Sequence, residues 1–415
     1  MVSSAASAPA GPRMLSPPQP LMLVLVANLG STSFKYRLFR MDEADGEVVA
    51  KGGYERVTDH GQAISDTLAE LQSQGVVSSP DEIDAVGFKT VLGRNLSGCV
   101  DADERVIEAL EGFATVAPAH NPPYAAGIRL FRKLMPKARH VALFETAFYQ
   151  WVPEQATRYA VPKSWHDIGV RRYGFHGASH KFIAERSAEL CAREDVAEVA
   201  RRLYLDGARD PGGKPFRVIS FHLGGSSSVT GIRNGAAIGT SMGFSPQSGL
   251  PQNNRVGDLD SAAIPHAVRT LGISLEEADR QLSKEGGLLG LSGVSNDIRD
   301  IRAAADSGNG DAQLALDVLV HSARHWAGAF HFAMGGVDAL AFTAGIGENG
   351  PPLRAAICAG LEALGIRIDR ARNQACSGGK EALISTDDSP VKIFVIPANE
   401  ELVLAREVYR KVSAN

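Results

Sequence analysis

Two strand–turn–strand patterns that lie far apart in the chain constrain its fold more than any other feature. In the first, the apolar run Leu23–Ala27 leads through a Gly/Ser turn into the alternating run Phe34–Phe39. In the second, Val218–Phe221 leads through a turn with two glycines and three serines into Val229–Ile232. Short apolar runs and period-two alternation are typical of β-strands. The repeat predicts two related domains that face each other across a cleft.

Glycine-rich turns follow three of the expected strands. Besides the two turns above, the run Ala339–Thr343 leads through a turn at 344–350 into a helix that begins at Pro351. Glycine accounts for 43 of the 415 residues, against a usual ~7%. Successive backbone N–H groups in such turns form a concave site for anionic oxygens. One such turn is typical of any hairpin, but two matched turns and a glycine-rich strand-to-helix turn indicate phosphate binding.

Chain length and charge narrow the class of protein. At about 100–200 residues per domain, a chain of 415 residues predicts two or three domains. Lys and Arg number 43 against 47 Asp and Glu, so the net charge is −4 and a basic surface for nucleic acid or membrane is not expected. No apolar run approaches the roughly 18–20 residues that cross a bilayer. We therefore expect small-molecule partners, no nucleic acid and no membrane.

Cysteine spacing and the first residues bear on where the protein works. The four cysteines, Cys99, Cys191, Cys358 and Cys376, are scattered without a CxxC pair. This disfavours a zinc site or a disulfide framework and predicts a cytoplasmic location. Residues 1–20 are small, Pro-rich and nearly uncharged, and are interpreted as a disordered tail or as the product of an upstream start codon. A targeting segment is the alternative, although a basic region followed by an apolar one is lacking.

Helical periodicity between the strands predicts a doubly wound α/β architecture. The last helix is expected to begin after Pro397, with Glu400 and Glu401 in its first turn, where the helix dipole favours carboxylates. On its own, this helix-terminus role would explain both glutamates. The expected helices are 63–72, 103–111, 178–193, 275–282 with Ser274 as N-cap, 311–334 and 399–412.

Three polar stretches carry residue types that suit phosphoryl transfer. They are Asn28, Ser31, Ser33 and Lys35; the run 171–180; and the run 254–258. A phosphoryl-transfer enzyme holds a metal ion with carboxylates and places cations around the moving group. Each stretch also has a structural alternative. His176 can cap the helix that follows it, and Arg255 can form an exposed pair with Asp258 or Asp260, which contributes about 0–1 kcal/mol.

Nine stretches, in order along nearly the whole chain after residue 20, carry a family resemblance. They are NLGSTSFKYRLF (28–39), APAHNPP (117–123), RRYGFHGASH (171–180), HLGGSSS (222–228), TSMGFSPQSGL (240–250), NRVGDLD (254–260), LLGLSGVSNDIRD (288–300), FTAGIGENG (342–350) and VIPANEELVLARE (395–407). Together they resemble the acetate kinase family, within the larger group of two-domain sugar kinases, Hsp70 and actin-like ATPases.

This resemblance implies a fold and an activity. The expected fold is α/β, with two ribonuclease H-like domains of the actin, Hsp70 and sugar kinase type facing each other across a nucleotide cleft. The first domain would comprise residues 21–150 and 396–415 and hold the acid and the metal. The second, 151–395, would hold the nucleotide. Members of the family move the γ-phosphoryl group of ATP onto the carboxylate of a short acid, giving an acyl phosphate, and form homodimers.

The resemblance also implies roles for individual residues. Asn28 and Glu400 would bind Mg²⁺ or Mn²⁺, and Arg255, His176 and Glu145 would act at the moving phosphoryl group. The nucleotide would be ATP or ADP. The remaining expected contacts are Lys89, Val91, Ala119, Phe175 and Pro246 for the acid; Ser31, Ser33, Lys35, His120, His222 and Gly224 for the phosphates; and Asp297, Ile298, Arg299, Gly345, Ile346, Gly347 and Asn349 for the adenosine.

Phosphoryl transfer to a carboxylate demands positive charge in the cleft. The carboxylate is a weak nucleophile that approaches an anionic phosphate, so repulsion opposes the reaction unless cations neutralise it. A guanidinium such as that of Arg255 can bridge carboxylate and phosphoryl oxygens and contribute about 10³–10⁵ in rate. A general base is not required, because the attacking carboxylate is already ionised at pH 7.

The expected site departs from the family pattern at several positions. Lys89 stands where the family has an arginine, so the charge is kept without the planar fork. Arg94, five residues on, would lie on the other side of a strand. Glu145 replaces an aspartate and reaches about one bond further. The phosphate turn, usually His-Leu-Gly-Asn-Gly, loses an amide side chain and a glycine at Gly225 and Ser226.

These departures leave several hypotheses open. In the first hypothesis the protein is an acyl kinase for another acid, because Ala119 stands where the family has a larger aliphatic residue and so enlarges the pocket. Alternatively, it is an acetate or propionate kinase of lower rate, or it has kept nucleotide binding and lost catalysis. A phosphohydrolase on the same fold, with Glu145 orienting water, is a further hypothesis. Because the residues expected at the phosphoryl group and the metal are retained, we expect a carboxylate kinase that acts on acetate or propionate.

Overall fold

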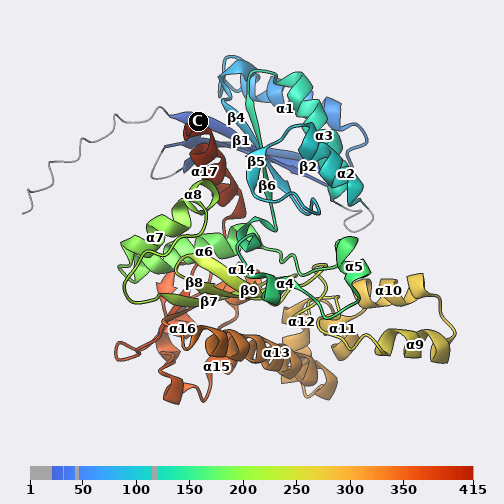
Figure 1. Ribbon diagram of the computed structural model, residues 1–415, viewed down its shortest axis with the longest axis vertical. Helices are drawn as coiled ribbons and strands as arrows, with labels where there is room; N and C mark the ends of the chain where they lie inside the picture. Colours follow the sequence, from blue (N-terminus) through green and yellow to red (C-terminus); the bar gives the residue numbers. More distant parts are fainter. Residues whose placement is uncertain (1–20, 31, 43–45, 115–119, 415) are drawn as a thin grey trace, which may run out of the picture.

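Two six-stranded sheets, one in each lobe, form the framework of the protein (Figure 1). The expectations placed on the tail 1–20, on Ser31 and on Ala119 fall outside the part of the chain that is described, and they stay predictions. Within the described residues, no helix is both long enough and apolar enough to cross a membrane. The computed structural model describes residues 21–30, 32–42, 46–114 and 120–414.

The first sheet combines an antiparallel ribbon with parallel strands. Its strands are β1 (Met22–Leu29), β2 (Ser33–Met41), β3 (Gly46–Glu55), β4 (Ala85–Thr90), β5 (Cys99–Asp101) and β6 (Arg139–Phe144). Their order is β3-β2-β1-β4-β6-β5, with β1, β4 and β6 parallel and the other neighbouring pairs antiparallel. The middle of β1 is fully buried, as a central strand covered on both faces requires.

The second sheet repeats this topology. Its strands are β7 (Arg217–Leu223), β8 (Ser227–Arg233), β9 (Ala236–Thr240), β10 (Ala339–Thr343), β11 (Ala382–Leu383) and β12 (Lys392–Val395). The order is β9-β8-β7-β10-β12-β11, with β7, β10 and β12 parallel and the other neighbouring pairs antiparallel. Strand for strand this is the arrangement of the first sheet. The α/β fold with two related domains, predicted from the paired turns, is confirmed.

Helices cover both faces of the first sheet. On one face, α17 (Glu400–Ser413) lies so close to β4 that a side chain at Gly87 would collide with it. On the other face lies α3 (Asn121–Leu134), where the rings of Phe88 and Phe131 meet edge-on with centroids 5.5 Å apart. Gly87 and Phe88 are consecutive strand residues and therefore point to opposite faces. The C-terminal helix thus completes the N-terminal lobe.

The second sheet lies between α6 (Gly177–Leu190) and α13 (Gly310–Met334). Along β7, Val218 belongs to the hydrophobic cluster under α6, whereas Ile219 and Phe221 belong to the cluster under α13. This alternation is the expected consequence of a strand buried on both faces. The other helices are α1 (His60–Ser73), α2 (Glu104–Gly112), α4 (Glu154–Thr157), α5 (Lys163–Asp167), α7 (Glu194–Arg201), α8 (Leu203–Asp206), α9 (Ala263–Leu271), α10 (Leu275–Lys284), α11 (Gly287–Ser292), α12 (Ile298–Asp306), α14 (Ala344–Asn349), α15 (Pro351–Cys358) and α16 (Arg370–Ala375), with short 3₁₀ helices η1 (Pro80–Glu82), η2 (Ala147–Tyr149) and η3 (Glu362–Leu364).

The helices predicted from periodicity are present, and two of their N-caps are as expected. The Ser274 hydroxyl accepts from the Glu277 N–H at 3.1 Å at the start of α10, and the Asn399 side chain accepts from the Leu402 N–H at 3.1 Å at the start of α17. These bonds satisfy amide groups that a helix leaves unpaired at its N-terminus.

The glycine-rich segment after β10 differs from the prediction of a turn over 344–350. Residues 344–349 form α14, and α15 begins directly after it. Ala344 enters α14 with a φ of 64°, a left-handed conformation that costs an alanine roughly 1–2 kcal/mol. The prediction was wrong because the chain reverses at this alanine rather than at a glycine, which leaves the glycines free to continue into a helix.

Helices α6 and α17 also contact each other between the lobes (Figure 1). Lys181 and Glu185 of α6 face Glu407 and Arg410 of α17 in a network of ion pairs. Lys181 and both glutamates are buried. The packing of α17 on the first sheet is what the proposed division into 21–150 with 396–415 and 151–395 requires. The boundaries themselves stay predictions.

Candidate active site

Polar residues gather where the parallel strands of the two sheets end. In open α/β sheets the carboxyl ends of the strands border the ligand crevice. Two helix N-termini, those of α6 and α17, reach the same region and add positive dipole ends that favour anions. The residues brought there are Asn28 on β1, Lys89 on β4, Glu145 after β6, His222 on β7, His176 before α6 and Glu400 at the start of α17.

Lys89 lies between two carboxylates. Its Nζ is 2.8 Å from Glu145 Oε1 and also donates to Glu400 Oε2. Burial raises the pKa of Glu145, and the Glu400 charge adds to this while Lys89 opposes it. Burial would also raise the pKa of Glu400, but Lys89 and His222 hold it below its ordinary value. Glu145 Oε2 is buried and has no hydrogen-bond partner among the described residues. One ammonium therefore serves two carboxylates.

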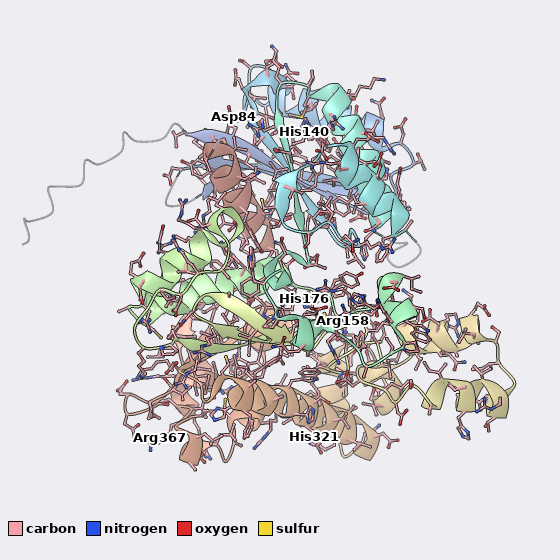
Figure 2. All side chains as sticks on the ribbon, in the orientation of Figure 1. Asp84, His140, Arg158, His176, His321 and Arg367 are labelled. Carbon is pink, nitrogen blue, oxygen red and sulfur yellow. The ribbon has the colours of Figure 1, made fainter. Side chains whose placement is uncertain are left out.

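A close contact between α6 and the end of β6 positions His176, which lies between the two lobes (Figure 2). The Gly177 N–H donates to the Glu145 carbonyl at 2.9 Å, and a Cβ at Gly177 would collide with that oxygen. His176 has a left-handed backbone, with a φ of 61°. Its side chain makes no capping bond; Nδ1 instead lies 2.8 Å from Ser228 Oγ. The interpretation of His176 as only a helix cap is therefore wrong.

Three histidines, of which His180 and His222 are buried and His176 is half-buried, form a cluster with serines. The rings of His176 and His222 are stacked with centroids 4.0 Å apart. Ser228 Oγ lies 2.8 Å from both His176 Nδ1 and His180 Nε2, and Ser179 Oγ lies 2.8 Å from His222 Nδ1. Burial lowers the pKa of all three imidazoles, to about 4 for His222. The imidazoles are therefore neutral at pH 7. His176 and His222 each use Nδ1 for a serine, which leaves Nε2 to face an anion. His180 uses both ring nitrogens, with Nδ1 2.7 Å from Ser220 Oγ and Nε2 2.8 Å from Ser228 Oγ.

Arg255 is a half-buried guanidinium held by neutral oxygens. Its Nη1 lies 3.2 Å from Gln252 Oε1, 3.3 Å from Ser226 Oγ and 3.4 Å from the Pro246 carbonyl. Gln252 is buried and ties this group together, because its Nε2 donates to the Pro246 carbonyl at 2.6 Å and its Oε1 accepts from Ser226 at 2.7 Å. Burial lowers the pKa of Arg255. Neighbouring side chains thus aim the guanidinium without neutralising it.

The alternative pairing of Arg255 with an aspartate is wrong. Asp258 accepts instead from a backbone N–H at 2.9 Å and from the Trp326 indole at 3.1 Å, and Asp260 accepts from the Ala262 N–H at 2.9 Å. Among the described residues no carboxylate forms an ion pair with Arg255. A cation in a partly desolvated place without a counter-ion favours an anionic ligand.

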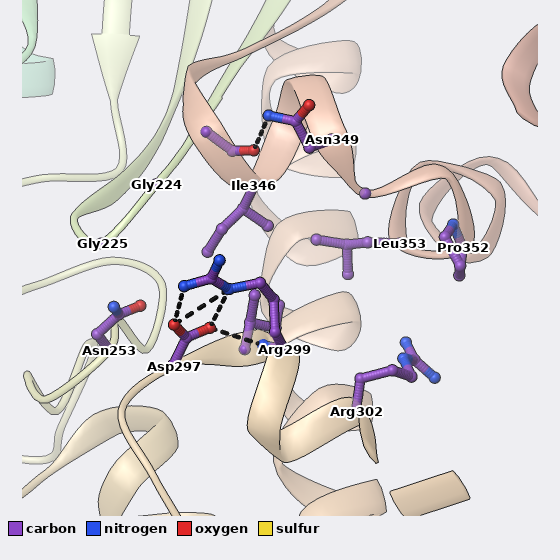
Figure 3. A pocket seen from close by; sticks show the side chains of 13 residues that line it. Gly224, Gly225, Asn253, Asp297, Arg299, Arg302, Ile346, Asn349, Pro352 and Leu353 are labelled. Carbon is purple, nitrogen blue, oxygen red and sulfur yellow. Dashed lines mark hydrogen bonds and ion pairs between the residues drawn. The ribbon is translucent and has the colours of Figure 1, made fainter. Parts of the chain in front are cut away.

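A cavity of about 680 Å³ adjoins this region on the second lobe (Figure 3). The phosphate turn forms one end of it, and Ile346, Pro352 and Leu353 give the other end an apolar lining. Asp297 caps α12 and is paired with Arg299 at 2.5 Å at the rim. The lining residues are Gly224, Gly225, Asn253, Asp297, Ile298, Arg299, Arg302, Gly345, Ile346, Asn349, Gly350, Pro352 and Leu353.

Gly347 is the one residue predicted at the adenosine that does not line this cavity. It is buried, and its carbonyl accepts from Arg354 Nη1 at 2.7 Å. Arg354 is completely buried and also donates to the Asn373 side chain at 2.8 Å and to the Cys376 carbonyl at 2.7 Å. Its five donors can satisfy several carbonyl groups at once. Arg354 thus braces the cavity wall from behind, a role that the sequence motif did not reveal.

Some of the residues predicted around the acid lie close together. Val91 and Phe175 belong to one small apolar cluster, which also contains Leu92, Phe113, Tyr173, Met242 and Phe244. Pro246 lies beside Arg255 and contributes its carbonyl. Ala119 lies outside the described residues. That these residues contact the acid stays a prediction.

Arg94 and Lys35 lie elsewhere than predicted. Strand β4 ends at Thr90, and Arg94 adopts a φ of 54° in the turn that follows and donates to the Asp167 carbonyl at 2.9 Å. The expectation that Arg94 lies on the far side of a strand is wrong, because the chain has already left the sheet. Lys35 is exposed and pairs with Glu55 at 2.9 Å.

Two further residues predicted at the phosphates lie at element boundaries. The Ser33 carbonyl accepts from the Gly30 N–H at 2.9 Å, which closes the turn between β1 and β2. His120 occupies the N-cap position of α3 without a side-chain capping bond. Burial lowers the pKa of His120, and the charges of Arg255 and Lys89 add to this, which places the imidazole near both cations.

Sequence and structure comparisons agree with this site. The Acetokinase family model matches residues 53–406. This chain belongs to the acetate kinase family. It is 40% identical to an acetate kinase from Clostridium botulinum over 93% of this chain and 98% of that protein, and 39% identical to one from Geobacillus kaustophilus over 93% and 98%. A crystal structure of Porphyromonas gingivalis acetate kinase superposes with a TM-score of 0.84 and 34% identity, covering 94% of this chain and all of the other.

A propionate kinase from Francisella tularensis is also similar, with a TM-score of 0.78 and 29% identity over 94% of this chain and all of the other. Membership of the acetate kinase family makes the protein a phosphotransferase with a carboxyl group as acceptor, and ATP or ADP its nucleotide. The resemblance predicted from the nine motifs is therefore confirmed.

The cleft of this acetate kinase family member fits a hard divalent cation. Mg²⁺ prefers oxygen ligands and commonly takes one or two carboxylates with substrate phosphates completing its shell. Among the described residues, Lys89 uses Oε1 of Glu145 and leaves Oε2 without a partner, and the Asn28 amide oxygen accepts from the Tyr124 hydroxyl at 3.2 Å. Within the described residues no three His, Cys, Asp or Glu side chains are arranged as a complete metal site. The donors present suit an ion held jointly with a phosphate.

Sequence reasoning missed several residues that hold the site together. Gln252 orients Arg255, Ser228 joins two imidazoles, and Asn253 lines the cavity beside the phosphate turn. Gln252 and Asn253 directly precede the quoted NRVGDLD stretch, so only their position offered a signal. Ser226 lies 26 residues before its partner Gln252, and His176 lies 52 residues before its partner Ser228, which is why spacing along the chain did not reveal these contacts.

Proposed function

We propose that the protein transfers the γ-phosphoryl group of ATP to acetate or propionate and releases the acyl phosphate and ADP. The observation that carries this proposal is the guanidinium of Arg255, which is half-buried and has no carboxylate partner within the described residues. It is held between the phosphate turn, through Ser226, and Pro246, near the expected acid site. An anionic group of the substrates would supply the counter-ion of this guanidinium.

In this proposal the chain's own residues position and neutralise the reactants. Arg255 contacts the acid carboxylate and the moving phosphoryl group together, because its planar fork offers parallel N–H donors. His176 and His222 are neutral and stacked, and each donates one N–H to phosphoryl oxygens as charge develops there. The acid attacks through an oxygen that is already ionised at pH 7, so no side chain has to remove a proton from it.

Lys89, Glu145, Glu400 and Asn28 form the cation side of the proposed site. The Lys89 ammonium has three N–H donors and uses two for Glu145 and Glu400. The third is available to the acid carboxylate, which it would hold at one point. We propose that Glu400 and Asn28, with Glu145 Oε2 adjoining, hold Mg²⁺ or Mn²⁺. When bound, that ion neutralises charge on the β- and γ-phosphates.

The apolar wall supports a short acid. Val91 and Phe175 lie in a small cluster separate from the main cores, and burying one methyl or methylene group contributes about 0.8 kcal/mol. Acetate places one methyl group against such a wall and propionate one methylene more. A longer or hydroxylated acid remains an outcome that the experiment below would detect.

The test is hydroxylamine trapping of the acyl phosphate. Protein, ATP and Mg²⁺ are incubated with acetate, propionate, butyrate, lactate or glycolate, and ADP release is followed in parallel. Hydroxamate formed most efficiently with acetate or propionate supports the proposal. Hydroxamate formed chiefly with another acid overturns the substrate assignment, and ADP release without hydroxamate with any acid indicates hydrolysis. Arg255→Ala is the matched variant and should abolish hydroxamate formation while ADP still binds.

We further propose that the protein is a cytoplasmic homodimer. The four cysteines are free in the structure, as a reducing compartment favours. Helix α9 buries none of its residues and exposes Leu271, which leaves an apolar stripe available to a second copy. Light scattering after size-exclusion chromatography should give twice the chain mass. A monomer at micromolar concentration contradicts the dimer.

A further inference from the structure

The side chain of Asn253 lies over the phosphate turn without a partner. Asn253 lines the cavity beside Gly225 (Figure 3), and its Oδ1 is buried with no hydrogen-bond partner among the described residues. Its backbone is fixed at both ends, because its N–H donates to the Gly225 carbonyl at 3.2 Å and its carbonyl accepts from the Leu289 N–H at 2.9 Å. A buried amide oxygen without a partner costs about 1–3 kcal/mol. Phosphate oxygens accept hydrogen bonds, so a phosphate bonds the amide through its N–H groups and not through this oxygen.

Gly225 is the position at which the acetate kinase family usually carries the asparagine of its phosphate turn. In this chain the amide side chain is missing there. A Cβ built on Gly225 would lie 3.4 Å from Asn253 Nδ2, so the Asn253 amide covers the side of the turn from which the missing side chain would project. Gly225 does not have a positive φ, so its backbone does not itself require glycine.

We propose that the Asn253 carboxamide binds the β-phosphate of the nucleotide and replaces the amide lost at position 225. This inference deepens the proposed function and rests on its placement of the γ-phosphoryl group at Arg255. A carboxamide presents two N–H donors, which suit phosphate oxygens, and bonds to charged groups are stronger than neutral ones. No covalent step is involved, and the two atoms of the amide can exchange places by rotation.

The position along the cavity selects the β-phosphate. The apolar end with Ile346 and Leu353 suits the adenosine, and the opposite end leads to Arg255. Asn253 lies between them, two residues before Arg255 in a tight turn that is closed by the Gln252 N–H and the Arg255 carbonyl at 3.0 Å. The same turn therefore carries the residue proposed for the β-phosphate and the one proposed for the γ-phosphoryl group.

The test compares ADP with AMP by isothermal titration calorimetry on the full chain. Asn253→Ala should raise the Kd for ADP about tenfold, the value of a hydrogen bond to a charged group, and leave that for AMP unchanged. Asn253→Asp should raise the ADP Kd further, because a carboxylate replaces the donors and repels the phosphate. The neighbouring Asn254→Ala serves as a control, since Asn254 does not line the cavity, and should leave both constants unchanged.

A second variant exchanges the two positions. Gly225→Asn combined with Asn253→Gly restores an amide to the turn and removes the one above it, and should return the ADP Kd to within about threefold of the unsubstituted protein. An unchanged ADP Kd in Asn253→Ala, or equal losses for ADP and AMP, would overturn the inference while leaving the proposed function intact. Failure of the unsubstituted protein to bind ADP more tightly than AMP would overturn the proposed phosphate placement as well. The ratio of the two constants does not depend on the fraction of folded protein.

Discussion

Helix α17 contributes a glutamate to each of two lysine–glutamate clusters, and the clusters differ in charge balance. In the cleft, Glu400 shares the ammonium of Lys89 with Glu145. Between the lobes, Glu407 shares Lys181 with Glu185, and Arg410 also contacts both of these glutamates, at 2.7 and 2.9 Å. The interlobe cluster thus sets Lys181 and Arg410, with Arg201 also 3.8 Å from Glu185, against two carboxylates, whereas the cleft cluster sets one lysine against two.

This difference in charge balance is reflected in the pKa values of the carboxyl groups. Burial opposes the charge of Glu185, but Lys181 and Arg410 prevail and lower its pKa to about 2. At Glu145 burial prevails and raises the pKa, and Oε2 has no partner within the described residues. Buried charges contribute stability only when they are fully paired. We infer that the balanced cluster serves the fold and that the unbalanced one is completed by a cation that arrives with the substrate.

The largest effect is expected from Arg255, which has no carboxylate partner among the described residues. Arg255→Lys should lower kcat/KM for phosphoryl transfer by about 10³-fold, towards the low end of the range for arginine fingers, because the ammonium keeps the charge without the fork. Thermal unfolding should be nearly unchanged. Steady-state rates and calorimetric melting curves measure both. Retention of a tenth or more of the activity contradicts the bridging role.

The next effect separates the two lysines. Lys181→Met should lower the free energy of unfolding by about 3–5 kcal/mol, since two buried carboxylates lose a partner. Lys89→Met should lower it by less than Lys181→Met does, because the Lys89 side chain is 31% exposed against 1% for Lys181. Urea unfolding gives both values. An equal decrease in the free energy of unfolding in the two variants would contradict the proposed difference between the clusters.

A matched pair of glutamate variants tests the comparison further, because the same Glu→Gln substitution should change the free energy of unfolding in opposite directions in the two clusters. Glu185→Gln should lower the free energy of unfolding by about 2–3 kcal/mol. Glu145→Gln should leave it unchanged or raise it by up to about 1 kcal/mol, since it removes the carboxylate whose pKa burial raises and leaves Lys89 with one partner. Urea unfolding at pH 7 decides the sign. A loss in both variants contradicts the inferred charge deficit.

The smallest effect concerns acid stability. The pKa of Glu185 is lowered from its ordinary value to about 2 in the folded protein. Its contribution is therefore fully present above about pH 4.5 and is lost as pH falls towards 2. The difference in unfolding free energy between the unsubstituted protein and Glu185→Gln should narrow by about half between pH 5 and pH 3. Urea midpoints across this range test it; a constant difference rules out the titration of Glu185 as the cause.

Much of the site was predictable from the sequence because phosphate turns, helix starts and strand ends leave local patterns. His222 lies at the cleft and Gly345 lines the cavity, while their roles stay predictions. The exposed position of Lys35 could not be predicted, because alternation along a strand does not say which face borders the cleft. The helical form of α14 was missed since one alanine, Ala344, takes the left-handed conformation that glycine usually provides.

By itself, the sequence determined the family, the two-lobed α/β fold and the residue types in the cleft. Repeated motifs and the periodicity of apolar residues are local patterns that can be recognised along the chain. Only the tertiary structure decided which charges meet. It placed Lys89 between carboxylates 56 and 311 residues away, as the numbering of Glu145 and Glu400 shows. It left Arg255 without a counter-ion among the described residues and set Asn253 over the turn at Gly225. Pairing between distant elements depends on how the lobes pack, and no local pattern encodes it.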